Sequence, residues 1–539
     1  MKAIARRAAF CSAAAMIGLS FADATAADNR KPTITERQMY GYVGDEASLL
    51  LSRSALQRLD TRAGAHEKKD SVRRVAFWHK ALLDAIAVDL TADPSTGAPP
   101  ADQVGPTRAS RALAMTQIAV FDAVNAFEQR YNAYNDIGEA PANASMNAAI
   151  AYAAHDVLVA LYPGQKKRID ELLAADLMTL SEPRSAISRG RRIGKASASA
   201  IMMRRAADNS FDPEPDYGEG GRIASGSSTH YGTPVNGGTA LMYEWTPDPL
   251  TPNPSTPSGV NELALGAYWG GVTPFALTSG NQFRAPPPPP PGSAAYVAAY
   301  NEVAAVGGSP DNTGTQSVST PQTRFIGNYW GYDGVPRLGT PPRLFAQIAV
   351  QVAMDKGVRN AADLARFLAM VHVALADAGI AAWDSKYYYN YWRPVTAIRR
   401  GDSVPSTATD AGWSPVGVSV INTTAPIRAT PPFPAYPSGH ATFGAATFEI
   451  MRRFYGHRTP FTFVSEEYDG NGVDPFGTPR PLVPVRFDSF TEAQFENGLS
   501  RIYNGVHWSY DNTQGQAIGV KVGRHVLDGI EPFRKKKAK

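Results

Sequence analysis

Three segments in the last third of the chain carry side chains that could together bind an oxyanion. They are KYYYNYWRP, with Lys386 and Arg393, PFPAYPSGHATFG, with Ser438, Gly439 and His440, and SRIYNGVHWSYD, with Arg501, His507 and Asp511. Cationic groups, a hydroxyl and a glycine amide suit the oxygens of a tetrahedral or trigonal-bipyramidal anion, whereas they would repel a metal cation. The expected ligand is phosphate or an analogue such as vanadate.

The first segment is expected to be helical. Lys386 and Arg393 are seven residues apart, which is two helical turns, so both are predicted to project from one face. A solvated pair on an exposed helix is the plainer alternative, but Trp383 and Tyr387 on that face are too aromatic for it. Pro394 disfavours helix at the residue before it, so the helix should end at Arg393.

The second segment is expected to start a helix. Ser438 is a favoured N-cap residue, and free amides at a helix N-terminus bind anions. Gly439 would let the backbone approach an oxyanion closely. An ordinary capped helix explains Ser438 equally well, but not His440, because a cation in the first turn opposes the helix dipole.

In the third segment a turn must separate the functional residues. Arg501 and His507 are six apart and would diverge by about 120° on one continuous helix. Gly505 is therefore expected to end the helix and let both residues face one site. Asp511 lies four residues after His507 and could accept its imidazole N–H, which would fix the tautomer.

Taken together, the segments resemble the vanadium-dependent haloperoxidases, which share a superfamily with type 2 phosphatidic acid phosphatases and bacterial acid phosphatases. The shared pattern is K-x6-RP, PSGH and SR-x5-H-x3-D, and every position of it is present. WGYDGVPRLGTPPRLFAQI (330–348) and PPFPAYPSGHATFGAA look like the chloroperoxidase branch. The resemblance is specific from Arg324 to Asp511 and only general in the N-terminal half.

The resemblance implies a role for each residue. It implies that His507 bonds vanadium through a ring nitrogen and that His440 is the acid/base. The groups that would hold the vanadate oxygens are Lys386, Arg393, Ser438, the Gly439 amide and Arg501. Asp333 matches an acid that pairs with Arg501. Trp383 and Phe433 match two aromatic walls of a halide pocket, and plain core packing is an equal alternative for both.

The implied activity is oxidation of halide by hydrogen peroxide to hypohalous acid, with vanadate as cofactor and Lys386 polarising the peroxide. Bromide is the expected halide, chloride remains open, and a small organic acceptor would be halogenated. One alternative is an acid phosphatase in which His507 forms a phosphohistidine. A second is a non-catalytic periplasmic phosphate or vanadate binder, which would have no need of His440.

Apolar periodicity predicts an all-α protein of two packed helical bundles joined by long Pro/Gly-rich connections. Helices are expected over residues 71–90, 108–128, 144–161, 185–207, 361–383, 439–455 and 513–527. The predicted divisions are a signal peptide (1–26), an N-terminal helical half with a Pro-rich connector (27–320), a catalytic bundle (321–533) and a basic, frayed tail (534–539). The six prolines Pro286 to Pro291 should form a rigid connector on the surface.

The N-terminal segment and the composition predict the cellular location and the kinds of partner. Lys2, Arg6 and Arg7, a short apolar stretch and Ala24-Thr25-Ala26 are typical of a signal peptide, so the protein should be exported, periplasmic or secreted. The single cysteine, Cys11, lies in that segment, which excludes a disulfide framework. Without residues 1–26 and 534–539 the chain has 45 basic and 48 acidic residues, so nucleic acid is not an expected partner. No later stretch predicts a membrane span.

Overall fold

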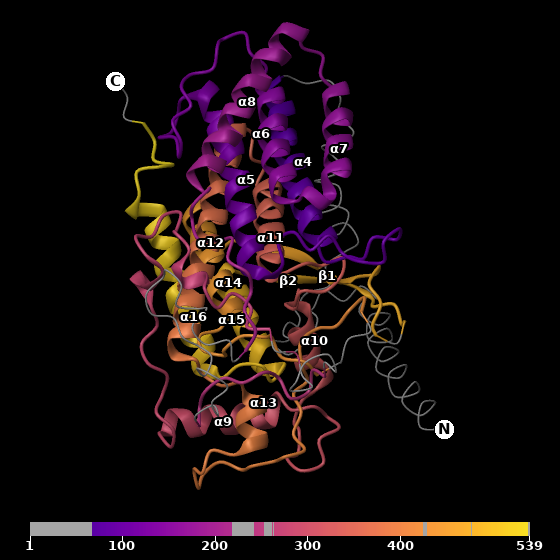
Figure 1. Cartoon of the computed structure of the whole chain (residues 1–539), viewed down its shortest axis with the longest axis vertical. Helices are drawn as coiled ribbons and strands as arrows, with labels where there is room; N and C mark the ends of the chain where they lie inside the picture. The colour runs from indigo at the N-terminus through magenta and orange to yellow at the C-terminus, as the bar shows by residue number, and fades with distance from the viewer. Residues whose placement is uncertain are drawn as a thin grey trace.

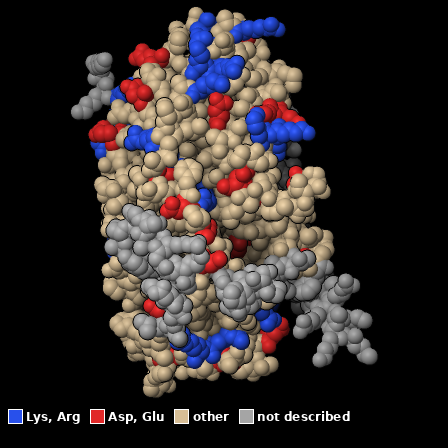
Figure 2. Space-filling model, in the orientation of Figure 1, with Lys and Arg blue, Asp and Glu red and all other residues tan. Residues whose placement is uncertain are grey.

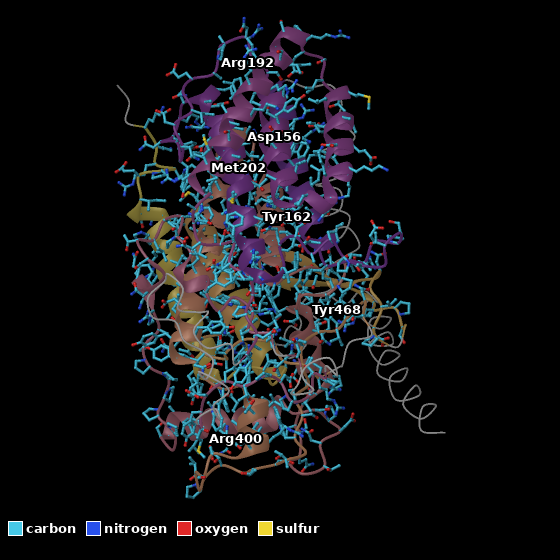
Figure 3. All side chains as sticks on the ribbon, in the orientation of Figure 1. Asp156, Tyr162, Arg192, Met202, Arg400 and Tyr468 are labelled. Atoms are coloured by element: carbon cyan, nitrogen blue, oxygen red, sulfur yellow. The ribbon has the colours of Figure 1, made fainter. Side chains whose placement is uncertain are left out.

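Helices make up nearly all of the regular structure in this computed structural model, which describes residues 67–217, 242–252, 261, 263–423, 428–475 and 477–536. Figure 1 shows them stacked along the long axis, with the helices of lowest residue number at one end. Figure 3 places Arg192 and Met202 toward that end and Arg400 toward the other. The predicted all-α class is confirmed. The predicted signal peptide and Cys11 lie outside the described residues.

The described N-terminal helices are α4 (Glu67–Val88), α5 (Gly105–Glu128), α6 (Met146–Leu161), α7 (Lys166–Met178) and α8 (Arg184–Arg204). The sequence predicts all of them except α7, with ends that differ by at most four residues. α7 escapes prediction because it buries only Ile169 and Leu173, too few residues for a clear apolar stripe. Helix α5 is buried along most of its length and packs against α6, α8 and α12.

The later helices are α9 (Ala294–Val306), α10 (Pro321–Tyr329), α11 (Pro341–Asp355), α12 (Ala361–Tyr389), α13 (Pro394–Arg400), α14 (Gly439–Tyr455), α15 (Phe490–Tyr503) and α16 (Ser509–Arg524). Helix α14 has the predicted bounds, because Ser438 caps its start and Gly456, with φ +92°, ends it. An antiparallel hairpin of β1 (Phe461–Asp469) and β2 (Leu482–Phe487) pairs Phe461 with Phe487.

Helix α12 is the centre of the molecule. In the described part of the chain it alone reaches the length and hydropathy of a membrane span, and 94% of its most apolar 18-residue window is buried inside the protein. It packs against α5, α14, α16 and α11, and Figure 1 draws it between the N-terminal helices and the later ones. These contacts make α12 a core helix that joins the N-terminal helices to the later ones.

Part of the Pro-rich connector is buried against the helices, a feature that the sequence does not predict. Residues 264–277 include the buried side chains of Leu265, Trp269 and Phe275. Asp377 of α12 accepts hydrogen bonds from the backbone N–H groups of residues 275, 276 and 277 at 2.7–2.8 Å. The run Pro286–Pro291 is exposed or half-buried, as predicted for a surface segment.

One continuous hydrophobic core includes residues from Val72 to Phe533 and so lies on both sides of the predicted division near residue 320. The structure shows no gap in packing at that division, which therefore stays a prediction. The prediction of a frayed basic tail is wrong for residues 534–536. Arg534 accepts a backbone hydrogen bond from Asn132 at 2.8 Å, and Lys536 donates one to Arg130 at 3.0 Å, while their side chains remain exposed.

Candidate oxyanion site

The three segments meet inside the protein where α12, α14, α15 and the starts of α13 and α16 come together. The candidate residues there are all less than 10% exposed: Lys386, Arg393, Ser438, His440, Arg501, His507 and Asp511. On the face drawn in Figure 2, Lys and Arg atoms gather toward the two ends of the molecule. The site's cations are buried and do not belong to those surface groups.

The prediction that Lys386 and Arg393 share one helix is wrong. Helix α12 ends at Tyr389, because Asn390 takes the left-handed conformation with φ +47°. The next residues pair with another segment, since Trp245 N–H donates to Asn390 O at 2.8 Å. Pro394 then starts α13, and Arg393 is its extended N-cap residue. A turn, and not a shared helix face, brings the two cations together.

Lys386 is held by backbone carbonyls. Its Nζ donates to Pro434 O at 2.8 Å and to Ala435 O at 2.9 Å. It also lies 5.0 Å from the ring centroid of Phe433. Complete burial, and then the charge of Arg393, lowers the pKa of Lys386 well below its usual value.

Arg393 has one free donor. Its Nε donates to Phe433 O at 3.0 Å, and its Nη1 donates to Val506 O at 2.6 Å. Its Nη2 is buried and has no hydrogen-bond partner. Burial lowers the pKa of Arg393 to about 9, against the favourable charge of Asp511.

Arg501, on α15, pairs with Asp333. Its Nη2 lies 2.7 Å from Asp333 Oδ1, and its Nε is buried without a partner. Asp333 also accepts the Ser419 N–H at 3.0 Å. Helix α15 ends at Tyr503, and Gly505, with φ +72°, turns the chain as the sequence predicts.

The tautomer of His507 is set by Asp511. The Nδ1 of His507 lies 2.8 Å from Asp511 Oδ2, which also accepts the Trp508 N–H at 3.1 Å. The carboxylate therefore accepts a hydrogen bond from Nδ1–H, and Nε2 keeps its lone pair toward the site. Arg393 Nη1 lies 3.3 Å from that Nε2. Burial, and then the neighbouring cations, lowers the pKa of His507 well below its usual value, so the ring is neutral.

His440 is also neutral. Its Nε2 lies 2.8 Å from Gly331 O, and because a carbonyl only accepts, Nε2 carries the proton and Nδ1 is the free acceptor. Burial, and then Arg501, lowers the pKa of His440 to about 3. The dipole of α14 is therefore not opposed by a charged His440 in the first turn. Asp333 Oδ1 lies 3.6 Å from the same Nε2 and links His440 to Arg501.

Ser438 and Gly439 form the start of α14. The Ser438 hydroxyl accepts from the Ala441 N–H at 3.4 Å, and the Ser438 N–H donates to Asp511 O at 3.0 Å. Any Cβ at Gly439 would lie 3.2–3.3 Å from the Trp383 ring. Tight packing is thus a reason for glycine at this position that the sequence did not reveal.

Trp383 and Phe433 lie beside the cations. Their ring centroids are 4.9 Å apart, and Lys386 Nζ is 5.6 Å from the Trp383 centroid. The Trp383 indole N–H donates to Leu265 O at 3.0 Å. Motif analysis missed Leu265, Ser419 and the carbonyls of 433–435, because backbone groups carry no sequence signal of their own.

An oxyanion fits this site. Arg393 Nη2 and Arg501 Nε are buried donors without acceptors. Burying an unpaired donor destabilises the fold unless a ligand supplies the acceptor. Lys386, Arg393 and Arg501 outnumber Asp333 and Asp511, and both histidines are neutral. Among the described residues no group of three or more His, Cys, Asp or Glu could hold a metal cation. A bound anion would complete the hydrogen bonds and offset the excess positive charge.

Sequence comparisons place the chain among known proteins. Residues 366–535 match the family described as VCPO second helical-bundle domain. The chain is 30% identical over 506 residues to the vanadium chloroperoxidase of Curvularia inaequalis, covering 82% of this chain and 80% of the relative.

Solved structures share the fold. A bacterial vanadium-dependent iodoperoxidase aligns with TM-score 0.63 and 22% identity, over 86% of this chain and 98% of its own. A holo-type bacterial vanadium-dependent chloroperoxidase aligns with TM-score 0.56 and 18% identity, over 81% of this chain and 95% of its own.

Proposed function

This chain belongs to the vanadium-dependent haloperoxidases, and on that premise we propose how its buried site holds vanadate and selects a halide. It is an enzyme that uses vanadate to oxidise halide with hydrogen peroxide to hypohalous acid. The single observation that carries the proposal is the pair of buried, unpartnered donors on Arg393 and Arg501. We assign them to two vanadate oxygens.

Groups from all three segments of the site would hold vanadate. Lys386, Arg393 and Arg501 supply charge, and the Ser438 hydroxyl and Gly439 amide supply neutral donors at the start of α14. His507 Nε2 would be the ligand atom, because the contact between Nδ1 and Asp511 leaves the lone pair of Nε2 free. Asp511 thereby orients the ligand without touching the cofactor.

Vanadate, when bound, supplies a Lewis acid that activates peroxide without a change in its own oxidation state. Lys386 polarises the peroxide from a position fixed by the carbonyls of Pro434 and Ala435. His440 accepts a proton at Nδ1, since its Nε2 proton is directed to Gly331 O. Protonation there draws support from Asp333, 3.6 Å from Nε2.

Trp383 and Phe433 form the walls against which halide approaches. Their separation of 4.9 Å, their burial and their contact with Lys386 support this assignment. We assign bromide as a substrate and leave open whether chloride is also oxidised. The hypohalous acid would then halogenate a small organic acceptor. We further propose that the protein is exported, and N-terminal sequencing of the mature protein should then begin at Ala27.

Reconstitution with orthovanadate tests the proposal. Apoprotein should gain bromide-oxidising activity as orthovanadate is added, measured by bromination of monochlorodimedone with peroxide, and phosphate should compete. Equal activity after exhaustive removal of vanadium would contradict it.

An acid phosphatase would use the same free Nε2 of His507 as a nucleophile. The apoprotein should accordingly hydrolyse an aryl phosphate slowly. Turnover as fast as that of dedicated phosphatases, without halide oxidation, would favour that alternative.

A further inference from the structure

A turn in the connector is hydrogen-bonded to one wall of the assigned halide pocket and to the residue directly before the other. The carbonyl of Leu265 accepts hydrogen bonds from the Trp383 indole N–H at 3.0 Å and from the Tyr387 hydroxyl at 2.9 Å. The N–H of the same residue donates to Pro432 O at 3.0 Å, directly before Phe433. One peptide segment thus fixes the ring of one wall and the backbone directly before the other.

Gly266 brings this turn against the indole. Its φ is +74°, and a Cβ built there would lie 2.5 Å from Trp383 Nε1 and 2.6 Å from Cδ1. The indole is 1% exposed and its neighbours leave little room for it to move. Any side chain at residue 266 must therefore displace Trp383 or the turn itself.

Half-buried polar contacts hold the turn in place. The Gly266 N–H donates to Glu214 Oε2 at 2.5 Å, and the Ala264 N–H donates to Pro215 O at 2.9 Å. Arg108 of α5 contacts Glu214 Oε1 at 3.4 Å and donates to the Tyr268 hydroxyl at 2.5 Å. The anchor therefore comes from the N-terminal half, far from the catalytic motifs in sequence.

We propose that the Leu265–Gly266 turn, anchored by Glu214, is a positioning element that sets the halide selectivity of the enzyme by fixing Trp383 and the backbone before Phe433. The inference rests on the proposed function, because it assumes that these two rings face the halide. The turn supplies none of the groups that we assign to vanadate or peroxide, so it would act through the two walls. A shift of one wall changes the space for halide beside Lys386, whose Nζ lies 5.0–5.6 Å from both ring centroids.

The test compares Gly266→Ala with Gly357→Ala in the vanadate-loaded enzyme. Gly357 also has positive φ, at +69°, but a Cβ there would meet nothing within 4 Å, so this control carries the backbone penalty alone. For each variant, kcat/KM is measured with iodide, bromide and chloride, and vanadate affinity is measured by titration calorimetry. Glu214→Gln is a milder second variant that keeps the shape of the side chain and weakens the anchor.

Gly266→Ala should lower kcat/KM unequally, with the largest loss, on the order of tenfold or more, for the halide hardest to oxidise, because misplacing a reacting group by about 1 Å can cost 10²-fold. Vanadate affinity should stay within about twofold of the wild type, and Gly357→Ala should match the wild type throughout. Glu214→Gln should change the selectivity in the same direction by less. If Gly266→Ala does not fold, the Glu214→Gln result decides alone.

An equal loss for all three halides would overturn the inference, because a smaller active fraction lowers every rate by the same factor. Unchanged selectivity in Glu214→Gln, with Phe433→His altering it, would also overturn the inference while leaving the proposed function intact. A wild type that oxidises no halide with vanadate present would instead remove the proposed function and the inference with it.

Discussion

Two of the buried clusters that pair arginines with carboxylates in the described part of the chain differ in their hydrogen bonding: one has unused donors and the other has none. In the N-terminal half, Asp208 accepts from Arg111 Nε and from Arg205 Nε, each at 2.8 Å. Arg205 Nη1 donates to Pro274 O at 3.1 Å, and Arg205 Nη2 donates to Thr273 O. No atom of this cluster is among the buried unpartnered atoms of the described residues.

The site around Arg393 and Arg501 differs in hydrogen bonding rather than in net charge. Each cluster has one more cation than carboxylate among the residues that define it. Carbonyl oxygens complete the N-terminal cluster, whereas the catalytic cluster leaves Arg393 Nη2 and Arg501 Nε without acceptors. Buried charge alone therefore does not identify a binding site, and unsatisfied donors inside a charged cluster do.

The largest effect should come from the two histidines. His507→Ala removes the ligand atom and should lower turnover by more than the ~10²–10³-fold typical of losing one oxyanion donor, with weaker vanadate binding. His440→Ala should keep vanadate bound and slow the reaction by ~10²–10⁴-fold. Vanadate titration beside steady-state turnover checks both variants. Loss of affinity in His440→Ala with affinity kept in His507→Ala would reverse the assignment of ligand and acid/base.

The next effect separates the two arginine clusters. Arg393→Gln should lower turnover by ~10²-fold and abolish most of the thermal stabilisation by vanadate. Arg205→Gln breaks a buried ion pair and should destabilise the fold by ~3–5 kcal/mol, yet vanadate at 100 times its Kd should still add about 2.7 kcal/mol. Differential scanning calorimetry with and without vanadate checks this, and Arg205→Lys serves where Gln prevents folding. An equal loss of stabilisation by vanadate in both variants would contradict the claim that only the cluster around Arg393 and Arg501 binds vanadate.

A third effect extends the comparison to a buried histidine pair that lies away from the site. His79 Nε2 and His372 Nε2 are 3.2 Å apart, and burial lowers the pKa of His79 to about 3. The unfolded chain binds a proton at about pH 6.5 and the folded chain does not, so stability is full above that pH and falls as pH decreases toward 3. His79→Gln should reduce this slope by at most about 1.4 kcal/mol per pH unit.

Urea unfolding between pH 3 and 6.5 measures that slope. His372 is 14 residues before Lys386, about 21 Å along α12 at 1.5 Å per residue, so vanadate should not change the contribution of His79. An unchanged slope in His79→Gln would show that this histidine is protonated in the folded protein.

The smallest effect concerns the wall of the halide pocket. Phe433→His should lower chloride oxidation more than bromide oxidation, by a few-fold in the ratio, because a polar ring changes the hydrogen bonding beside Lys386. Competition assays with both halides measure the ratio. If the ratio does not change, Phe433 serves only packing.

Sequence reasoning was most successful where one element carries its own signal. The periodic helices and the capped start of α14 were predictable, because apolar spacing and Ser438 act locally. The predicted shared helix for Lys386 and Arg393 was wrong. A spacing of seven residues fits two helical turns, and no local pattern indicates that Asn390 takes the left-handed conformation. The burial of residues 264–277 was not predictable either, because Gly and Pro erase periodicity whether a segment is exposed or buried.

The sequence by itself determined the chemistry: three motifs with cationic, hydroxyl and imidazole groups specify an oxyanion site, and strong apolar periods specify an all-α protein. Only the tertiary structure decided which donors remain free, which nitrogen of each histidine carries the proton, and that Leu265 and Gly266 pack against Trp383. The physical reason is that residue type sets charge and donor capacity locally. Whether those donors find acceptors depends on backbone carbonyls from distant segments. Backbone carbonyls are the same in every residue, so the sequence does not indicate which of them will be near.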